Sequence, residues 1–258
     1  ISNLDVAKAL VHFRYIEGNC TSEHGKFIGI GSGRASLEAN FYLKKLVGND
    51  HFSAGLSNNE MALSAVHQAI LSQYPPPNLQ EVEQSDLILV IGEDVTQTSP
   101  RMALSIRQAL QNASKDKAAD IGIPSWQDSA VRTVGGKALS PLYSLQCLST
   151  KLDDVAEKAA IVNPEEMIFC INTLNEYIKE HIIHANGSEL LAAGLGRKED
   201  NNLKSEFVKK HKLTDSQNHF IYSLFSALIA AKKPLIVTGW SLQSARLLDA
   251  INGLMSSL

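Results

Sequence analysis

The sequence predicts an α/β fold in which a mostly parallel sheet lies between two layers of helices. Three segments, at residues 26–48, 86–110 and 233–256, share one pattern, in which a short apolar strand leads through a turn into an amphipathic helix. Strands that alternate with helices favour parallel pairing, because each helix returns the chain to the start of the next strand. The middle strand, LILVI at 87–91, is apolar on both faces, which is typical of a sheet covered on both sides. We therefore expect a three-layer αβα arrangement.

The first of these segments is built around glycines. Residues 27–30 predict a short buried strand, and the run GIGSG at 29–33 then breaks it. A helix follows at once, with Leu43 and Leu46 on its packing stripe. A strand that enters a helix through glycines places the unpaired N–H groups of the helix N-terminus at the edge of a sheet. That geometry can bind an anion, and it can equally be no more than a tight turn.

The remaining elements follow from apolar spacing and from residues that start or stop helices. We expect further helices at residues 4–17, 60–73, 164–185, 203–212 and 217–231, and a short strand at 51–56. Ser99 and Pro100 predict the start of the helix that follows the middle strand. Asn58 or Asn59 is expected to cap the helix at 60–73.

A stretch of charged and small residues at 115–120 predicts a boundary between two lobes. We expect a first α/β lobe at residues 1–114, which contains the glycine-rich strand-to-helix turn, and a second α/β lobe at 115–258. Residues 121–143, with their paired glycines, are expected to be irregular. The last strand–helix unit, at 234–256, is expected either to stay with the second lobe or to pack with the first.

Composition narrows the class of protein. The 258 residues carry a net charge of −3 and are 44% hydrophobic, which describes an ordinary globular protein and gives no electrostatic case for nucleic acid. No apolar stretch approaches the roughly 20 residues that a membrane span requires, so we expect no membrane insertion. Cys20, Cys147 and Cys170 lie far apart without a C-x-x-C pair, so we expect no thiolate-held cluster or zinc site. Because the chain starts at Ile1, we interpret it as an internal piece of a longer protein.

Known nucleotide-binding and hydrolase motifs match the glycine run poorly. A dinucleotide fingerprint needs G-x-G-x-x-G. Gly29 and Gly31 match its first two glycines, but Arg34 stands where the third glycine is required. A P-loop lysine is absent, and Ser32 lacks the flanking glycines of a nucleophile elbow. The sequence therefore leaves open whether this turn binds a ligand.

Other residues carry a functional interpretation beside a simpler structural one. Glu93 and Asp94 follow the middle strand, at the edge where α/β folds bind ligands, so they could contact a ribose or a pterin or form a solvated turn. His181 and His184 share a helical face but have no evident third ligand, and we expect them to interact with the helix dipole. Trp126 and Trp240 are expected in the core or in an interface.

Several runs of residues resemble the molybdopterin oxidoreductases of formate dehydrogenase type. The run GIGSGRASLEAN at 29–40, the strand and turn at 87–92, and Ser99-Pro100 carry this resemblance. Residues 121–130 resemble a narrower branch, the large iron–sulfur G subunits of bacterial NADH-quinone oxidoreductase, respiratory complex I. The resemblance covers residues 4–258 and implies Rossmann-like lobes of the formate dehydrogenase/DMSO reductase type (domains 1–3).

The resemblance also implies a function, through its departures from the catalytic members. Those members ligate molybdenum with a Cys or selenocysteine, whereas the stretch HFSAGLS at 51–57 has none. The resemblance therefore implies a non-catalytic scaffold region, without a cofactor of its own, in a subunit that carries electrons from NADH to quinone. The 4Fe-4S and 2Fe-2S clusters of such a subunit would lie outside this chain.

The same resemblance implies partners, a location and a remnant site. The partners would be other subunits of the complex I peripheral arm, on the cytoplasmic side of the bacterial inner membrane. A vestigial cofactor-binding cleft would be lined by the residues of two turns, namely Gly31, Ser32, Gly33, Arg34, Gly92, Glu93 and Asp94.

Two alternative interpretations stay open at this point. Residues 233–239, KPLIVTG, also resemble the central domain of thiamine-diphosphate enzymes, which would make the chain a nucleotide-binding module. The third possibility is a molybdopterin-binding oxidoreductase domain that retains its pterin cleft without molybdenum.

Overall fold

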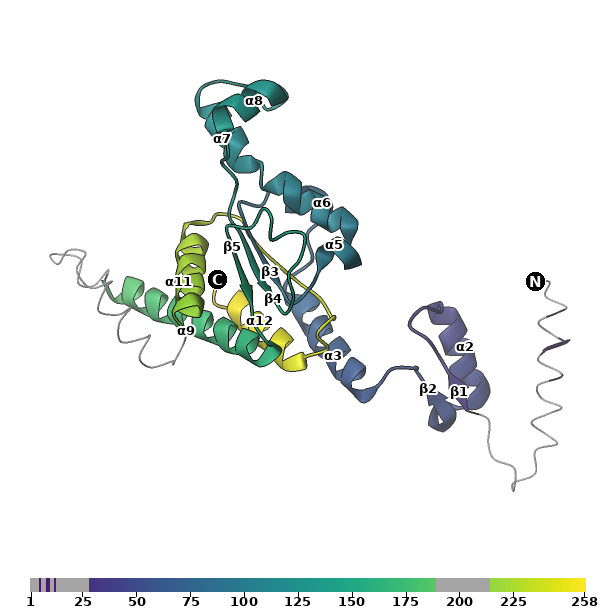
Figure 1. Cartoon of the computed structure of the whole chain (residues 1–258). Coiled ribbons are helices and arrows are strands. Elements are labelled where there is room, and N and C mark those ends of the chain that lie inside the picture. Colours follow the sequence, from purple (N-terminus) through teal and green to yellow (C-terminus); the bar gives the residue numbers. More distant parts are fainter. Residues whose placement is uncertain (1–4, 6–7, 10–11, 13–27, 189–213) are drawn as a thin grey trace. The chain divides into compact units, whose positions relative to one another are not determined.

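The computed structural model describes residues 28–188 and 214–258, together with positions 5, 8, 9 and 12. The chain divides into two compact units, at residues 1–62 and 63–258 (Figure 1). The predicted helices at 4–17 and 203–212 fall outside the described residues, apart from those four positions.

The second unit is organised around a four-stranded sheet in which all strands are parallel. The strands are β3 (Leu87–Ile91), β4 (Leu142–Gln146), β5 (Lys158–Ile161) and β6 (Pro234–Thr238). Their spatial order is β5-β4-β3-β6, so β3 lies between β4 and β6, with Leu89 opposite Tyr143 and Ile236. All five residues of β3 are buried, which confirms the predicted central strand.

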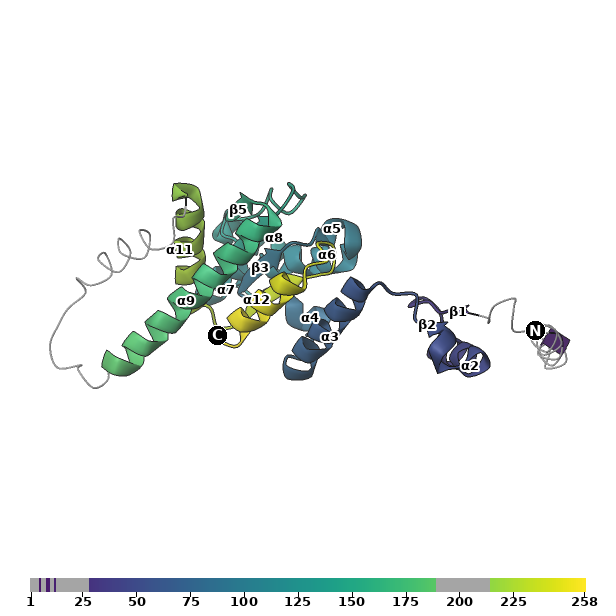
Figure 2. The same cartoon turned by 90° about the horizontal axis from the view of Figure 1, so that it is seen from below.

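Helices cover both faces of this sheet, which confirms the predicted α/β class (Figure 1). One layer is formed by α9 (Pro164–Ser188), α11 (Asp215–Ala230) and α12 (Ala245–Met255). Figure 2 shows α9 and α12 lying side by side. The other layer contains α4 (Leu79–Val82), α5 (Val95–Thr98) and α6 (Pro100–Ala109). The strand residues divide between the two layers by alternation, because successive side chains point to opposite faces.

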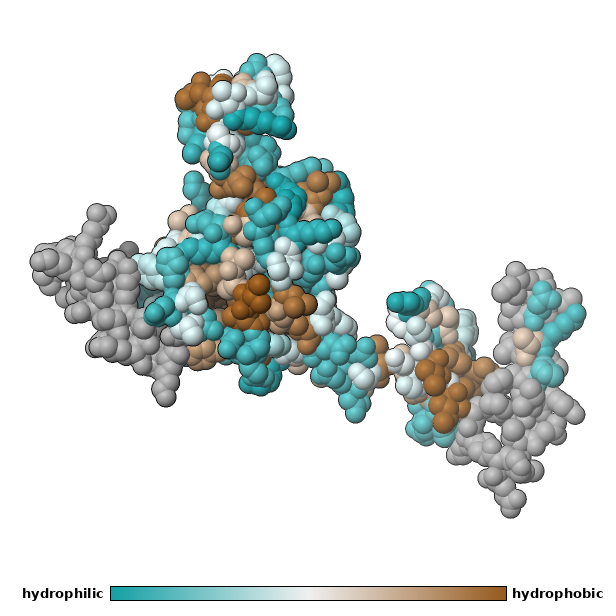
Figure 3. Space-filling model, viewed as in Figure 1, coloured by the Kyte–Doolittle hydropathy of each residue, from teal (hydrophilic) through white to brown (hydrophobic). Residues whose placement is uncertain are grey.

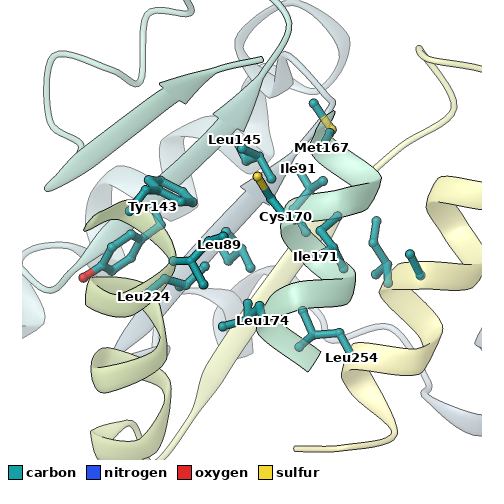
Figure 4. Close-up of a cluster of buried hydrophobic side chains, with 14 of the residues drawn as sticks. Leu89, Ile91, Tyr143, Leu145, Met167, Cys170, Ile171, Leu174, Leu224 and Leu254 are labelled. Atoms are coloured by element: carbon teal, nitrogen blue, oxygen red, sulfur yellow. The ribbon is translucent and has the colours of Figure 1, made fainter. Parts of the chain in front are cut away.

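The larger core lies between the sheet and the layer of α9, α11 and α12 (Figure 4). Leu89 and Leu145 project from the sheet toward Ile171 of α9 and Leu224 of α11. Cys170 sits in the same core, where burial and the nearby Glu166 carboxylate raise the pKa of its thiol to about 11. This cysteine is therefore a small apolar core residue at neutral pH.

Some helix starts follow the expected capping chemistry and others do not. Helix α6 begins at Pro100 as predicted, but the Ser99 side chain makes no capping hydrogen bond. Thr214 and Gln217 form a reciprocal capping box at the start of α11. The helix predicted at 60–73 is α3 (Asn58–Gln73), but neither predicted asparagine caps it. Ser57 does so instead, because its hydroxyl accepts the Glu60 N–H at 3.2 Å while Glu60 accepts the Ser57 N–H at 2.8 Å.

Residues 115–120, where the sequence predicts a boundary between two lobes, belong to a helix. Helix α7 (Asn112–Asp120) pairs with α8 (Asp128–Gly135) in a helical hairpin. Ala118 is fully buried, and the Ser114 hydroxyl donates to the Ala138 carbonyl at 2.6 Å. The small residues among the charged ones therefore give α7 a packed face, which a linker would not have.

The stretch predicted to be irregular, 121–143, contains α8 and the start of β4. Strands β4 and β5 were not predicted. The predicted lobe boundary after residue 114 falls inside the second unit, between β3 and β4, which pair directly. Strand β6 of the last strand–helix unit pairs with β3. The division into lobes at 1–114 and 115–258 stays a prediction for the longer protein.

The first unit is small. It contains β1 (Gly29–Ile30), α2 (Leu37–Val47), the 3-10 turn η1 (Asn49–His51) and β2 (Phe52–Ser53), followed by the start of α3. β1 and β2 pair in parallel, with Gly29 opposite Phe52. No residue of α2 is buried, and Ile28 and Ile30 are each 72% exposed, so the prediction of a buried strand here is wrong.

Candidate functional site

The turn after β3 is shaped by a glycine in the left-handed region. Gly92 has a φ of +65°, and a Cβ there would lie 2.6 Å from Leu242 Cδ1. Only glycine meets both demands without strain, because it has no Cβ. The residues after β6 thus pack directly onto the turn after β3, at the carboxyl edge of the sheet.

Glu93 is buried in this turn and bonds to the loop after β6. Its carboxylate accepts the Ser241 hydroxyl at 2.8 Å and the Ser241 N–H at 3.2 Å, and only 7% of the residue is exposed. A Cβ on Gly239 would overlap the Glu93 carboxylate. Gln146, at the end of β4, donates to the Glu93 carbonyl oxygen at 3.1 Å. Glu93 therefore ties together the carboxyl ends of β3, β4 and β6.

Asp94 is engaged as well. Its carboxylate accepts the Thr96 N–H at 3.0 Å and the Thr96 hydroxyl at 2.6 Å, so it caps the short helix α5. The acidic pair was predicted either to contact a ligand or to form a solvated turn. As arranged here, both side chains bond to the protein itself, and the Glu93 carboxylate occupies the space that a side chain at position 239 would need.

The glycine turn of the first unit is closed by an asparagine from α2. The Asn40 amide accepts the Ser32 N–H at 3.0 Å and donates to the Ser32 carbonyl at 2.9 Å. The Ser32 hydroxyl accepts the Arg34 N–H at 3.1 Å, while nothing lies within 4 Å of a Cβ built on Gly33. Gly33 and Arg34 are exposed. The turn is thus fixed by its own side chains and leaves Arg34 on the surface.

The N-terminus of α2 is partly occupied by its own residues. The Ser36 hydroxyl accepts the Ala39 N–H at 3.1 Å, as an N-cap does. Hydrogen bonds from the Glu38 backbone N–H and the Ser36 hydroxyl lower the pKa of the Glu38 carboxyl. A carboxylate at this position already interacts favourably with the positive end of the helix dipole, so an external anion would meet a competing negative charge.

The seven predicted cleft residues therefore fall into two groups in two separate units. The glycine-turn residues, from Gly31 to Arg34, lie in the first unit, and those from Gly92 to Asp94 lie in the second. A bound pterin or dinucleotide does not fit the second group as it is arranged here. The Glu93 carboxylate already fills the space next to Gly239 and bonds to Ser241. Cofactor binding by these residues stays a prediction.

Sequence reasoning missed the residues that close these turns. Asn40, Gln146 and Ser241 are separated from their partners by 8, 53 and 148 positions. The sequence offered one signal, the polar residues Ser144 and Gln146 in the strand LYSLQ, since such side chains must find partners when buried.

A second acidic side chain organises the loop between β4 and β5. Asp153 accepts hydrogen bonds from the hydroxyls of Ser144, Ser149 and Thr150 and from the Thr150 N–H, at 2.8–3.0 Å. Burial would raise the pKa of this carboxyl, but the four hydrogen bonds outweigh it and lower the pKa. Asp153 therefore holds this loop in place through the hydrogen bonds that its carboxylate accepts.

No group of three or more His, Cys, Asp or Glu side chains that could hold a metal occurs among the residues the structure describes. The ring of His181 packs edge-on against Phe225, with ring centroids 5.4 Å apart, and the side chain of His184 lies outside the described part. Burial raises the pKa of the Cys147 thiol.

The two tryptophans were predicted in the core or in an interface. Trp240 packs edge-on against His67, whereas Trp126 is 78% exposed in the α7–α8 loop and is not a core residue.

A hollow in the described part of the chain lies at the amino edge of the sheet in the second unit. It has a volume of about 540 Å³ and is polar; its lining is formed by Gln80, Glu83, Gln84, Asp86, Asn112, Lys115 and Asp116. The Asp86 carboxylate accepts the N–H groups of Lys232 and Lys233, at 2.7 and 2.9 Å. Asn112 donates to the carbonyls of Glu83 and Ser85. These groups hold the loops together at the amino edge of the sheet, whereas Gly92, Glu93 and Asp94 follow the carboxyl end of β3.

No helix in the described part of the chain combines the length and apolar character needed to span a membrane. No protein-family model matches the chain.

Comparison with curated proteins identifies clear relatives. The chain is 33% identical over 233 residues to the NADH-quinone oxidoreductase G subunit of Pseudomonas fluorescens, and 34% identical over 234 residues to that of Pseudomonas putida. It is 32% identical over 238 residues to the same subunit of Escherichia coli strain K12. Each match covers 90% of this chain. The predicted resemblance to the G subunit is confirmed, and the alternative of a thiamine-diphosphate-type nucleotide module is not favoured.

The chain spans 23% of the length of these curated relatives. It is therefore homologous to one region of a considerably longer subunit.

Proposed function

We propose that this chain forms a non-catalytic scaffold region of an NADH-quinone oxidoreductase G subunit. In this role it supports a subunit that passes electrons from NADH toward quinone. Its partners are the other subunits of the peripheral arm of complex I, on the cytoplasmic side of the bacterial inner membrane. The 4Fe-4S and 2Fe-2S clusters are held by parts of the subunit outside this region.

The observation that carries this proposal is the sequence identity of 32–34% to G subunits over 90% of the chain. The arrangement at the carboxyl edge of the sheet supports the non-catalytic part. There Glu93 bonds to Ser241, and Asp94 caps α5, so both carboxylates serve the fold. We regard the seven turn residues as the remnant of a cofactor cleft rather than as a working site.

The proposal is tested with two variants of the full-length subunit in the assembled complex. Arg34→Ala removes an exposed, charged side chain from the glycine turn. Leu89→Asp places a charge in the buried core beside the sheet. A scaffold role predicts that Arg34→Ala leaves NADH-quinone turnover per assembled complex unchanged. It predicts that Leu89→Asp lowers the amount of assembled complex.

Assembly is quantified by co-purification with a tagged partner subunit, and turnover is measured on the same sample. A large loss of turnover in fully assembled Arg34→Ala complex would contradict the scaffold role. Normal assembly with Leu89→Asp, in a subunit whose region is shown to be unfolded, would contradict it too.

A further inference from the structure

The two-stranded ladder of the first unit is covered on one face only. A Cβ on Gly29 would lie 2.9 Å from Val47 Cγ2 and 3.1 Å from Leu43 Cγ, and a Cβ on Gly31 would lie 2.6 Å from the Asn40 side chain. The glycines of β1 and its end thus face α2 and allow it to approach closely. Alternation along a strand then directs Ile28 and Ile30 to the opposite face.

That opposite face is exposed, and its β1 side chains are apolar. Ile28 and Ile30 are each 72% exposed, and Ser53, the partner of Ile30 in the ladder, is exposed too. Apolar residues gather on the surface of this unit in Figure 3. Further exposed apolar side chains of the unit are Leu37, Phe41, Tyr42, Leu56 and Met61. Monomeric proteins rarely leave so much of a small unit apolar and exposed.

The parallel pairing of β1 and β2 also indicates that a second covering layer belongs on this sheet. Parallel sheets occur almost only with both faces covered, and a two-stranded ladder is marginally stable by itself. The sheet of the second unit obeys this rule, with helices on both faces. The first unit has the strands and one helix layer, but its described residues leave Ile28 and Ile30 each 72% exposed.

We infer that the face formed by Ile28 and Ile30 is the docking surface for an apolar helix from another region of the same subunit polypeptide. This inference rests on the proposed function, because it assigns the occupant to the remaining length of the G subunit. The relatives extend well beyond this chain, which spans 23% of them, so a covering segment is available in the same polypeptide.

Charge supports a permanent apolar contact rather than a transient one. Between residues 28 and 62, the basic residues Arg34, Lys44 and Lys45 balance the acidic residues Glu38, Asp50 and Glu60. A charge-balanced unit offers no electrostatic steering toward a dissociating partner. Obligate contacts are instead apolar and depleted in charge at their centre, as this face is.

Hydrogen exchange measured by mass spectrometry tests the inference in two proteins, this chain alone and the full-length subunit. The amides of residues 28–31 are expected to exchange at least about ten times more slowly in the full-length subunit. Peptides from β3 serve as the internal control, because that strand is already buried in this chain. Equal exchange of residues 28–31 in the two proteins would overturn the inference.

Two matched variants locate the contact in the full-length subunit. Ile30→Lys is expected to abolish the added protection, whereas Leu37→Lys, at a side chain that is 82% exposed on α2, is expected to retain it. Unchanged exchange in β3 shows that the rest of the region stays folded in either variant. Protection that survives Ile30→Lys, or that is lost equally in Leu37→Lys, would contradict docking at this face.

Other occupants give distinguishable results. Protection of residues 28–31 in this chain alone that increases with protein concentration would indicate a second copy and would overturn the inference. Co-purification of the full-length subunit with its complex is measured on the same sample. Failure to co-purify counts against the proposed function, whereas unprotected residues 28–31 in a co-purifying subunit count against this inference only.

Discussion

Glu93 shows how a residue suited to ligand chemistry can serve the fold. Its carboxylate is buried at the edge where α/β proteins bind ligands, yet it accepts two hydrogen bonds from Ser241. A buried carboxylate is stable only when it is bonded in this way. The position of Glu93 after a strand was predictable, but its partner in a loop 148 positions away was not.

The contact between Glu93 and Gly239 predicts a strong coupling between two substitutions. Gly239→Ala alone is expected to reduce the free energy of unfolding by about 1–3 kcal/mol, because the new methyl group overlaps the carboxylate. Glu93→Ala alone is expected to cost about 1–2 kcal/mol through the lost hydrogen bonds. In the Glu93→Ala background, Gly239→Ala should cost about 0.5 kcal/mol or less, since the space is then free.

Urea unfolding of the four proteins of this double-mutant cycle measures the coupling. Additive effects of the two substitutions would show that Glu93 does not fill the space at Gly239. Gly33→Ala is a suitable control for a change of glycine, because nothing lies within 4 Å of its added methyl group.

Asp153 predicts a pH dependence of stability. Because hydrogen bonds lower the pKa of its carboxyl in the folded state, the stabilisation is fully present above the unfolded-state pKa of about 3.9. It is lost as the pH falls through the lower, folded-state pKa. Asp153→Asn is therefore expected to destabilise the protein by about 1–2 kcal/mol at pH 7, and this difference should shrink below about pH 4.

The neighbouring Asp154 provides the control for this prediction. Its side chain is 62% exposed and pairs with Arg107 at 2.9 Å, so Asp154→Asn is expected to cost no more than about 1 kcal/mol. Thermal unfolding of both variants between pH 3 and pH 7 makes the comparison. A pH-independent difference for Asp153→Asn would show that this carboxyl does not titrate differently in the folded and unfolded states.

At the scale of the elements, apolar runs predicted the structure best. The runs at β3 and β6, and the helices α3, α6, α9, α11 and α12, lie where the sequence places them. Strand β4 was missed because LYSLQ contains two polar residues. Both donate hydrogen bonds to residues outside the strand: Ser144 to the Asp153 carboxylate, and Gln146 to the Glu93 carbonyl oxygen. β5, KAAI, has too little apolar periodicity to be recognised at the edge of the sheet.

The α7–α8 hairpin gives a prediction at this scale. A Cβ on Gly135 would lie 2.5 Å from Ser114 Cβ, so Gly135→Ala is expected to push the two helices apart. Hydrogen exchange in α8 should become faster, while exchange in β3 stays unchanged. Arg132→Ala, which removes only an exposed ion pair with Asp128, is the control and should leave exchange in α8 nearly unaltered. Equal effects of the two substitutions would contradict this packing.

At the scale of the whole molecule, the second unit contains the extensive core. Its sheet is covered on both faces, whereas the first unit has no buried residue in α2. The sequence could not reveal this difference, since the apolar stripe of α2 resembles that of a helix in a complete sheet. The two helices differ in the sheet against which they pack, which has two strands in the first unit and four in the second. The strands of the larger sheet come from segments far apart in sequence.

This difference predicts that residues 57–258 fold without the first unit. Ser57 is kept because it caps α3. The shortened chain is expected to unfold cooperatively, with a Tm within a few degrees of that of the complete chain. Circular dichroism at increasing temperature measures this. Loss of the cooperative transition would show that residues 1–56 are part of the same folding unit.

The proposed scaffold role without cofactor chemistry is tested by the metal and pterin content of the purified chain. Molybdenum and iron are measured by inductively coupled plasma mass spectrometry, and pterin by the fluorescence of its oxidised form after denaturation. A scaffold without a cofactor is expected to contain far less than one molybdenum, iron or pterin per chain. A stoichiometric amount of any of them, retained through purification, would contradict it.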